Sequence, residues 1–432
     1  MPARCKLSKY DEVNKVNENL SEIAERAEAA LAGIFADIDR TAYKNTEKVI
    51  DAFREFKVGE ANFAPTTGYG YDDKGRDTLD LIYAKVFDAQ AAFVRHNIVN
   101  GTHALSIGLA ALLRPGDIML SVTGKPYDTL EEAIGIRGER GNGSLADFGI
   151  EYREVALNPD GSVNHAGITA ALKEYGQRVR VVFVQRSKGY MQRPTLSVAQ
   201  IGEIVKTSKA VSDAYVVVDN CYGEFTETQE PTALGADMII GSLIKNPGGG
   251  IAECGGYIAG TRRAVELASY RLTCVGIGLE CGASLGQSKN IYKGLFMAPH
   301  AVAQALKTAH FGAYVFDSLG YETIPKWNER RGDIIQMIQL GSAEKMIAFC
   351  RGIQSASPID SYVTPLPWDM PGYADQVIMA AGAFTSGSSI ELSADGPIKP
   401  PYSIYMQGGL TYESGKLGVL SAANEVISSN NG

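Results

Sequence analysis

Apolar side chains recur at three- and four-residue intervals over residues 7–58, with charged side chains between them. This spacing predicts amphipathic helix. The apolar stripe of such a helix has to pack against its own chain or against another subunit. The stretch TTGYGYDDKGRDTL, residues 66–79, breaks the helical period and predicts a loop.

Between about residue 80 and residue 290, short apolar runs alternate with helical segments such as SVAQIGEIVKTSKAVS. Several runs are apolar at nearly every position, as expected of strands buried on both faces of a sheet. The alternation predicts an α/β fold with a mostly parallel, seven-stranded sheet and helices on both sides. The predicted strands lie in AAFVRHNIVN, DIMLSV, YREVAL, VRVVFVQR, AYVVVDN, ADMIIGS and CGGYIAG.

The pattern changes beyond residue 290, where a long helical segment is followed by strand-like pieces and a loop-rich tail. A chain of 432 residues is too long for one small core. We therefore expect three parts: a helical N-terminal arm over 1–65, a large ligand-binding domain over 66–290, and a smaller α+β domain over 291–432.

Composition narrows the class of protein. The net charge is −8 and no long basic run occurs, which argues against a nucleic-acid partner. No apolar stretch has the length of a membrane span and the N-terminus lacks the apolar region of a secretory signal, so we expect a cytoplasmic protein without a membrane partner. Six scattered cysteines and five histidines show no zinc-ligand spacing, so we expect free thiols and no metal.

In a parallel sheet, ligands bind beyond the carboxyl ends of the strands. After the first predicted strand come Asn100, Gly101, Thr102 and His103, and then a helix rich in alanine and leucine. A glycine turn here would place backbone N–H groups at a helix N-terminus, where an anion can bind. The alternative is a plain junction in which Thr102 caps the helix.

Tyr127 and Asp219 also follow predicted strands. Tyr127 comes after a Gly-Lys-Pro turn and could stack on a planar ligand or pack on the next helix. Asp219 ends an apolar run, so its carboxylate is expected to be buried, which is costly unless it has a partner. A helix cap would be the simple explanation, but the Asn-Cys-Tyr-Gly that follows is a poor helix start. This favours a cationic ligand nitrogen near Asp219.

Lys245 follows the strand in MIIGSLIKNPGGG, where the glycines would let a cofactor approach the backbone. A solvated surface lysine is the alternative. Together the four segments offer a phosphate site, a stacking ring, a carboxylate for a pyridinium nitrogen and an amine for an aldehyde. This set predicts pyridoxal 5′-phosphate. An ionised Asp219 would keep the ring nitrogen protonated, and Lys245 would form the Schiff base and later transfer protons.

Five motifs resemble the bacterial aluminium-resistance protein family: FAPTTGYGYDDKGRDTL, NGTHAL, DNCYGEF, GSLIKNPGGGIAECGGYIAG and YSIYMQGGLTY. Members of that family are described as cystathionine β-lyase- or methionine γ-lyase-like pyridoxal-phosphate enzymes of fold type I. The resemblance covers nearly the whole chain. It implies an aminotransferase-like large domain, a small C-terminal domain, and a homodimer with a shared active site, paired into tetramers.

The resemblance also implies roles for individual residues. Lys245 is the Schiff-base lysine, Asp219 the pyridinium partner, and Tyr127 the stacking ring. The segment VQRSKGY is expected to border the cofactor ring through Gln185, Arg186 or Ser187. The implied phosphate ligands are Ser242, the turn of Gly101, Thr102 and His103, and, from the neighbouring subunit, Tyr71 (or Tyr69) and Arg76.

Two departures from the related lyases bear on the reaction. Those enzymes bind the substrate carboxylate through a C-terminal arginine, and this chain has no arginine after Arg351. Lys399 is the candidate substitute, although it offers a point charge in place of a planar fork; a solvated loop lysine is the alternative. Where the lyases have Ser-x-Thr-Lys, this chain has Ser242-Leu-Ile-Lys245 and so lacks one hydroxyl.

These observations lead to one main hypothesis, an enzyme that acts on a small-molecule substrate. It is a pyridoxal-phosphate carbon–sulfur lyase that eliminates a thiol from a sulfur amino acid, in the manner of cystathionine β-lyase. A methionine γ-lyase-like or other elimination is the alternative within enzymes. A non-catalytic pyridoxal-phosphate-binding or regulatory protein is the alternative from another class. A nucleotide-binding domain is disfavoured, because no G-x-G-x-x-G follows the first predicted strand.

Overall fold

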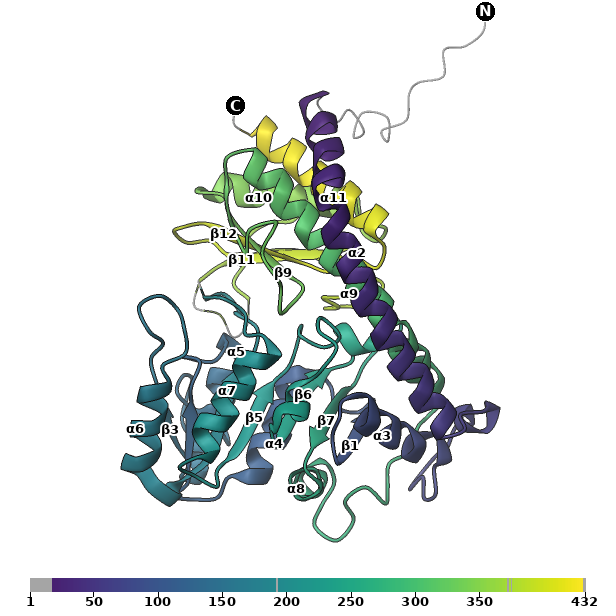
Figure 1. Cartoon of the computed structure of the whole chain (residues 1–432), viewed down its shortest axis with the longest axis vertical. Coiled ribbons are helices and arrows are strands. Elements are labelled where there is room, and N and C mark those ends of the chain that lie inside the picture. Colours follow the sequence, from purple (N-terminus) through teal and green to yellow (C-terminus); the bar gives the residue numbers. More distant parts are fainter. Residues whose placement is uncertain (1–17, 192, 371–372, 374, 430–432) are drawn as a thin grey trace, which may run out of the picture. The chain divides into compact units, whose positions relative to one another are not determined.

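The structure, a computed structural model, describes residues 18–191, 193–370, 373 and 375–429. The chain divides into two compact units, which are described separately (Figure 1). The large unit consists of residues 40–302 and 331–333, and the small unit of residues up to 39, 303–330 and from 334 onward. Helices α2 (Glu18–Glu55) and α9 (Ser288–Ser318) contribute residues to both units.

A seven-stranded sheet forms the centre of the large unit, in the order β1-β7-β6-β5-β4-β2-β3. Neighbours from β6 to β3 pair in parallel, whereas β7 runs antiparallel to both β1 and β6. The predicted sheet is therefore confirmed, and each strand overlaps a predicted segment. The strands are β1 (Ala91–Arg95), β2 (Ile118–Ser121), β3 (Glu151–Glu154), β4 (Val179–Gln185), β5 (Tyr215–Asp219), β6 (Met238–Ser242) and β7 (Gly256–Gly260).

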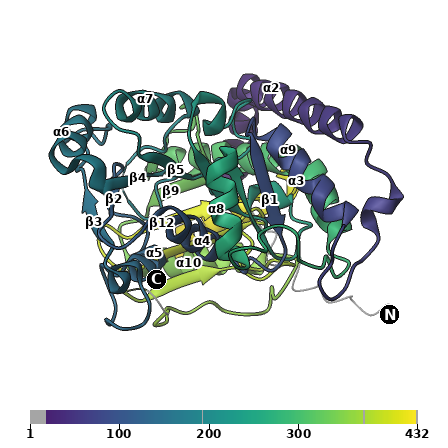
Figure 2. The same cartoon turned by 90° about the horizontal axis from the view of Figure 1, so that it is seen from below.

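Helices cover both faces of this sheet. Figure 2 shows α6 (His165–Tyr175) and α7 (Val198–Lys209) on one side and α4 (Gly101–Leu112) and α8 (Arg262–Leu272) on the other. This double cover explains why β4, β5 and β6 are buried at nearly every position. The remaining helical segments are α3 (Lys74–Val86), α5 (Asp128–Ile134) and the 3₁₀ turns η1 (Glu60–Phe63), η2 (Leu145–Phe148), η3 (Gly176–Arg178), η4 (Pro231–Leu234) and η5 (Asn246–Gly248).

The small unit is built on a five-stranded antiparallel sheet in the order β10-β11-β12-β9-β8. Its helices are α10 (Ala343–Ser355), α11 (Tyr412–Ser428) and parts of α2 and α9. This confirms the expected smaller α+β fold at the C-terminal end. The strands are β8 (Glu322–Ile324), β9 (Ile335–Gln339), β10 (Val377–Ala380), β11 (Ser393–Pro397) and β12 (Ser403–Gln407).

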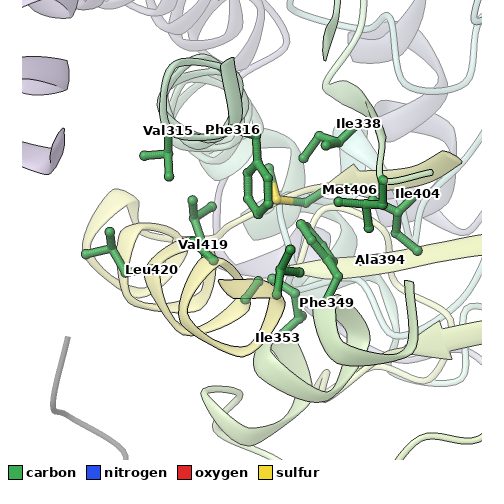
Figure 3. Close-up of a cluster of buried hydrophobic side chains, with 14 of the residues drawn as sticks. Val315, Phe316, Ile338, Phe349, Ile353, Ala394, Ile404, Met406, Val419 and Leu420 are labelled. Atoms are coloured by element: carbon green, nitrogen blue, oxygen red, sulfur yellow. The ribbon is translucent and has the colours of Figure 1, made fainter. Parts of the chain in front are cut away.

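The core of the small unit lies between its sheet and its helices. Figure 3 shows Phe316 of α9, Phe349 of α10, Met406 of β12 and Val419 of α11 packed together. The first half of α2 adds buried apolar residues to the same core, Leu20 among them. The apolar stripe of the predicted N-terminal helix therefore packs, in part, on the C-terminal region of its own chain.

The prediction of a loop over residues 66–79 is wrong for the second half of that stretch, because α3 begins at Lys74. Asp73 caps this helix: its carboxylate accepts a hydrogen bond from the N–H of Arg76 at 2.9 Å. The glycines and tyrosines of the stretch favoured a loop, so Asp73 was not recognised as the N-cap of a helix. The predicted helix over 7–58 is observed as α2 (Glu18–Glu55), and residues 7–17 lie outside the described residues.

Along the described chain, no helix combines the length and the apolar character that crossing a bilayer requires.

Candidate active site

The candidate residues gather at one edge of the large unit's sheet. Strands β4, β5 and β6 are adjacent and parallel, and they end at Gln185, Asp219 and Ser242. Gln185 is the register partner of Asp219. Because the carboxyl ends of parallel strands meet at one edge, the topology brings these residues together with the loop that carries Lys245.

Helix α4 begins at this edge with Gly101. Its N-cap is Asn100 and not Thr102, because the Asn100 carboxamide accepts the N–H of His103 at 2.8 Å. The first N–H groups of a helix have no partner within it. Those of Gly101 and Thr102 are therefore available to an anion, as in other helix N-termini that bind phosphate.

Ser242 lies beside this helix start. A Cβ added to Gly101 would be 3.7 Å from the Cβ of Ser242. The hydroxyl of Ser242 is fully buried and has no hydrogen-bond partner among the described residues. A buried hydroxyl without a partner costs free energy, and a phosphate oxygen would supply the missing partner.

Asp219 is buried, with 5% of its surface exposed, and its Oδ1 accepts the N–H of Cys221 at 3.1 Å. Burial raises the pKa of Asp219, and the nearby Lys245 partly opposes this effect. A protonated ring nitrogen would provide the cationic partner that a buried carboxylate needs.

The ammonium group of Lys245 lies over the ring of Tyr222, with Nζ 4.0 Å from the ring centroid. Burial acts to lower the pKa of Lys245, but the surrounding Cys221, Tyr222 and Asp219 raise it, and the balance lies well above the ordinary value. Lys245 is therefore not the solvated surface lysine of the alternative interpretation. It is a half-buried amine whose surroundings include Asp219, which the sequence analysis expected at the site, and Cys221 and Tyr222, which it did not.

Tyr127 is held at both ends. Its backbone N–H donates to the Oε1 of Gln185 at 2.9 Å, and its hydroxyl lies 2.9 Å from the hydroxyl of Thr102. Burial and the charge of Asp219 raise the pKa of Tyr127, so its phenol stays protonated at neutral pH. The Thr102 side chain is thus engaged with Tyr127, and only its backbone faces the anion site.

The rest of the VQRSKGY segment contacts other parts of the protein. Arg186 is fully buried and donates to Asn220 at 2.8 Å. Ser187 donates to the carboxylate of Asp333 at 2.7 Å. In this segment, the side chain of Gln185 contacts a site residue by accepting the backbone N–H of Tyr127.

His103, Tyr71 and Tyr69 are placed differently from the central group. His103 is exposed, and its imidazole Nδ1 accepts the N–H of Val99. Tyr69 and Tyr71 stack on each other, with their ring centroids 5.4 Å apart, and both are exposed. This exposure leaves the two rings available to a neighbouring subunit.

Arg76 is buried, and its guanidinium binds groups of its own chain. It donates to the carbonyl oxygens of Gly70 at 2.7 Å and Gly282 at 2.9 Å, and it pairs with Asp77. In this structure Arg76 therefore fastens the loop of Tyr69 and Tyr71 to the segment around Gly282.

Lys399 belongs to the small unit, where its Nζ pairs with Asp375 at 2.6 Å. More than half of its side chain is exposed. The amine of Lys399 is therefore ion-paired, although its side chain remains exposed to solvent.

Three residues at the site escaped the sequence analysis: Cys221, Tyr222 and Glu224. Tyr222 lies under Lys245, and Cys221 lies beside Gly101, whose added Cβ would be 3.4 Å from the thiol. The available signal was the rest of the motif DNCYGEF, which continues past the strand end without starting a helix.

The arrangement fits pyridoxal phosphate in its chemistry. Gly101, Thr102 and Ser242 offer donors for a phosphate, and the orphaned Ser242 hydroxyl is the feature that a bound phosphate would explain. Asp219 is a buried carboxylate for a ring nitrogen, and Lys245 is a half-buried amine for an aldehyde.

Comparison with known proteins identifies the family. A family model described as methionine gamma-lyase matches residues 20–427. The uncharacterized protein YnbB of Bacillus subtilis strain 168 is 50% identical over 411 residues, which cover 95% of this chain and 97% of that protein.

Two crystal structures are similar over nearly the whole chain. One is a carbon-sulfur lyase involved in aluminum resistance from Clostridium novyi NT, with 48% identity, a TM-score of 0.92, and coverage of 96% of this chain and 97% of that one. The other is a candidate cystathionine beta-lyase involved in aluminum resistance from Clostridium acetobutylicum, with 46% identity, a TM-score of 0.93, and coverage of 98% and 100%.

A more distant structure shows how widely the fold is shared. The pyridoxal-5′-phosphate dependent protein YhfS from Escherichia coli matches 91% of this chain and 97% of that one, with a TM-score of 0.59 at 16% identity. This confirms the predicted fold. The chain therefore belongs to the methionine gamma-lyase family, within its aluminium-resistance group, and has the fold of the type I pyridoxal-phosphate enzymes.

Proposed function

We propose that this protein is a pyridoxal-phosphate-dependent lyase that eliminates a thiol from a sulfur amino acid, in the manner of cystathionine β-lyase. The observation that carries the proposal is the setting of Lys245, a half-buried amine that lies over the Tyr222 ring and interacts electrostatically with Asp219 and Tyr127. Family membership supports it, since the relatives include a carbon-sulfur lyase.

Four groups of the large unit would hold the cofactor. The N–H groups at Gly101 and Thr102 and the hydroxyl of Ser242 would bind its phosphate. The carboxylate of Asp219 would accept a hydrogen bond from the protonated ring nitrogen and so keep that nitrogen charged. When bound, pyridoxal phosphate supplies an electron sink for the electron pair left at a substrate carbon that has lost its proton.

Two side chains would move or hold protons. Lys245 would hold the cofactor through Nζ and, once substrate amine has displaced it, would take the proton from the substrate α-carbon. Tyr127 would stack on the cofactor ring, and its neutral hydroxyl would be a proton donor within the site. Thr102 and Gln185 would orient Tyr127 through their hydrogen bonds.

The substrate carboxylate requires a cation, and Lys399 is the proposed one. It would have to exchange its ion pair with Asp375 for the substrate. Such an exchange is inexpensive because exposed ion pairs contribute little stability.

We further propose a cytoplasmic homodimer that shares its active sites, with two dimers forming a tetramer. The exposed, stacked rings of Tyr69 and Tyr71 support this proposal, since large exposed aromatic side chains are enriched at protein interfaces. A methionine γ-lyase-like elimination is a second candidate reaction, favoured by the description of the family model.

Spectroscopy and peptide mapping test the cofactor. The purified protein with added pyridoxal phosphate should be yellow, and borohydride reduction should fix the cofactor mass on the peptide that carries Lys245. Lys245→Ala should abolish the colour and the adduct. Lys125→Ala, which removes an exposed lysine from the turn before Tyr127, is the matched control and should retain both.

The reaction is tested with a panel of sulfur amino acids. Release of homocysteine from cystathionine, or of hydrogen sulfide from cysteine, together with pyruvate and ammonia would support β-elimination. Release of methanethiol with a four-carbon keto acid from methionine would support γ-elimination instead. A protein that stays colourless with the cofactor would refute both reactions, and a yellow protein that releases no thiol would leave a non-catalytic binding role.

A further inference from the structure

The segment Asn220–Phe225, which follows β5, is fixed by contacts from two other parts of the large unit. The buried guanidinium of Arg186 donates to the side chain of Asn220 at 2.8 Å. The Asn246 carboxamide donates to a backbone carbonyl of the segment at 2.9 Å. A Cβ added to Gly223 would lie 2.4 Å from the Arg186 Nε, so backbone and guanidinium are in close contact.

Tyr222 sits in this segment with a left-handed backbone, at φ 72°. Residues other than glycine rarely adopt this conformation, and a bulky one pays free energy to do so. A glycine would avoid that cost. The contacts that fix the segment, together with those of the Tyr222 side chain, offset this cost.

The contact that stands out is with Lys245, whose Nζ lies 4.0 Å from the centroid of the Tyr222 ring. Within the described part of the chain, no side chain or carbonyl accepts a hydrogen bond from this Nζ. A cation over the face of an aromatic ring is attracted by the ring quadrupole, and more strongly when both are shielded from water. The ring face is thus in direct contact with this ammonium, which the carboxylate of Asp219 also favours electrostatically.

We propose that Tyr222 is a positioning residue for Lys245: its ring face holds the protonated amine at the end of β6 until the amine reacts. This inference rests on the proposed role of Lys245 as the residue that binds the cofactor. A ring face suits that role, because it fixes the amine without a hydrogen bond that would have to break. It also favours the charged amine over the free amine.

The proposal is tested on the cofactor-free protein by weakening the ring quadrupole at constant shape. Tyr222→Phe keeps the ring face, and 3,4,5-trifluorophenylalanine at position 222 weakens its attraction for a cation. Lys245 is acylated with trace acetic anhydride at pH 8, and its peptide is quantified by mass spectrometry. The exposed Lys125 serves as the internal reference.

The expected result is a graded one. In Tyr222→Phe, the acylation of Lys245 relative to Lys125 should stay within about twofold of the wild-type value. The trifluoro side chain should raise this acylation roughly tenfold, because less of the amine is held as ammonium. Labelling that does not change with fluorination would overturn the proposal. A large change already in Tyr222→Phe would overturn it as well, since it would assign the effect to the hydroxyl.

Phe225 offers a matched control. It lies in the same segment and also has a left-handed backbone, at φ 63°, but its buried ring packs against Phe87. The same fluorinated side chain at position 225 should leave the labelling of Lys245 unchanged. A rise there equal to that at position 222 would mean that fluorination loosens the segment, and it would refute the ring-face interpretation.

The two proposals fail in different ways. If labelling follows fluorination but pyridoxal phosphate never forms an adduct on Lys245, the contact stands and the proposed function is wrong. If the adduct forms but the acylation of Lys245 is the same with and without fluorine at position 222, the proposed function stands and Tyr222 has no positioning role.

Discussion

At the scale of single residues, two buried polar groups close to the carboxyl edge of the large unit's sheet are informative. The hydroxyl of Ser242 and one carboxyl oxygen of Glu224 are both buried without a hydrogen-bond partner among the described residues. Such groups are rare in folded proteins because each one costs free energy. Ser242 faces the helix start at Gly101, whereas Glu224 lies next to Tyr257, so the two groups have different explanations.

Ser242→Ala should weaken the binding of pyridoxal phosphate by roughly tenfold, the effect of one hydrogen bond to a charged group. The dissociation constant from an absorbance titration measures this effect. Ser208→Ala is the matched control, since Ser208 of α7 also has a buried hydroxyl without a partner but lies outside the site. Equal affinity in both variants would remove Ser242 from the phosphate site.

Glu224 should make the protein less stable as the pH rises. Burial raises the pKa of Glu224 from about 4.5 to about 8. Between these values the folded state binds more protons than the unfolded state, so stability falls with rising pH. The side chain of the Glu224→Gln variant cannot ionise. The free energy of unfolding of this variant should therefore rise relative to that of the wild type by at most about 1.4 kcal/mol per pH unit in this window.

Melting temperatures of both proteins between pH 5 and pH 8 check this prediction. The difference in favour of Glu224→Gln should grow with pH. Parallel profiles would show that Glu224 is ionised throughout, with a cationic partner. Tyr257, whose hydroxyl donates to Glu224 at 2.9 Å, should keep that contact with the amide oxygen of the variant.

At the scale of elements, the start of α4 is the feature that links folding to the site. Asn100 caps this helix and thereby fixes the N–H groups that would meet a phosphate. The cap is a local feature of the sequence, but its function depends on the strand ends beside it. A second helix, α6, has the same kind of cap at Asn164, whose side chain accepts the N–H of Gly167.

Asn100→Ala and Asn164→Ala should each destabilise the protein by about 1 kcal/mol, the usual loss for an N-cap. Only Asn100→Ala should also weaken the binding of pyridoxal phosphate, because α6 does not border the site. Thermal unfolding and the cofactor titration separate the two effects. If both variants bound the cofactor equally well, the start of α4 would have no part in the phosphate site.

At the scale of the whole molecule, the shared active site is the main untested proposal. Tyr71 is exposed in the single chain, whereas Lys245 is half-buried. If Tyr71 completes the site of a neighbouring subunit, defects at these two positions should complement each other. In a closed dimer, each hybrid would contain one site with both residues intact.

Lys245→Ala and Tyr71→Ala should each be inactive, and refolding them together should recover about one quarter of the wild-type activity, since half of the dimers are hybrids with one intact site. Thiol release by the mixture measures the recovery. Tyr362→Ala, which removes another exposed tyrosine ring, should remain active and serves as the control. A mixture without activity would place Tyr71 in its own subunit's site or outside any site.

The sequence by itself determined the strands, their parallel sheet and the residues at its carboxyl edge. This was possible because burial on both faces leaves continuous apolar runs, and because Asp219 and Lys245 come directly after such runs. The sequence determined the helix starts less well, because capping residues stand next to glycines there. The start of α3 at Lys74 and the cap of α4 at Asn100 were therefore predicted wrongly.

Only the tertiary structure decided which side chains meet. It showed that Arg76 fastens two loops of its own chain, that Thr102 bonds Tyr127, and that Lys399 is held by Asp375. It also placed the Tyr222 ring under Lys245. These contacts join residues far apart in the sequence or depend on an unusual backbone angle, and neither periodicity nor spacing carries that information.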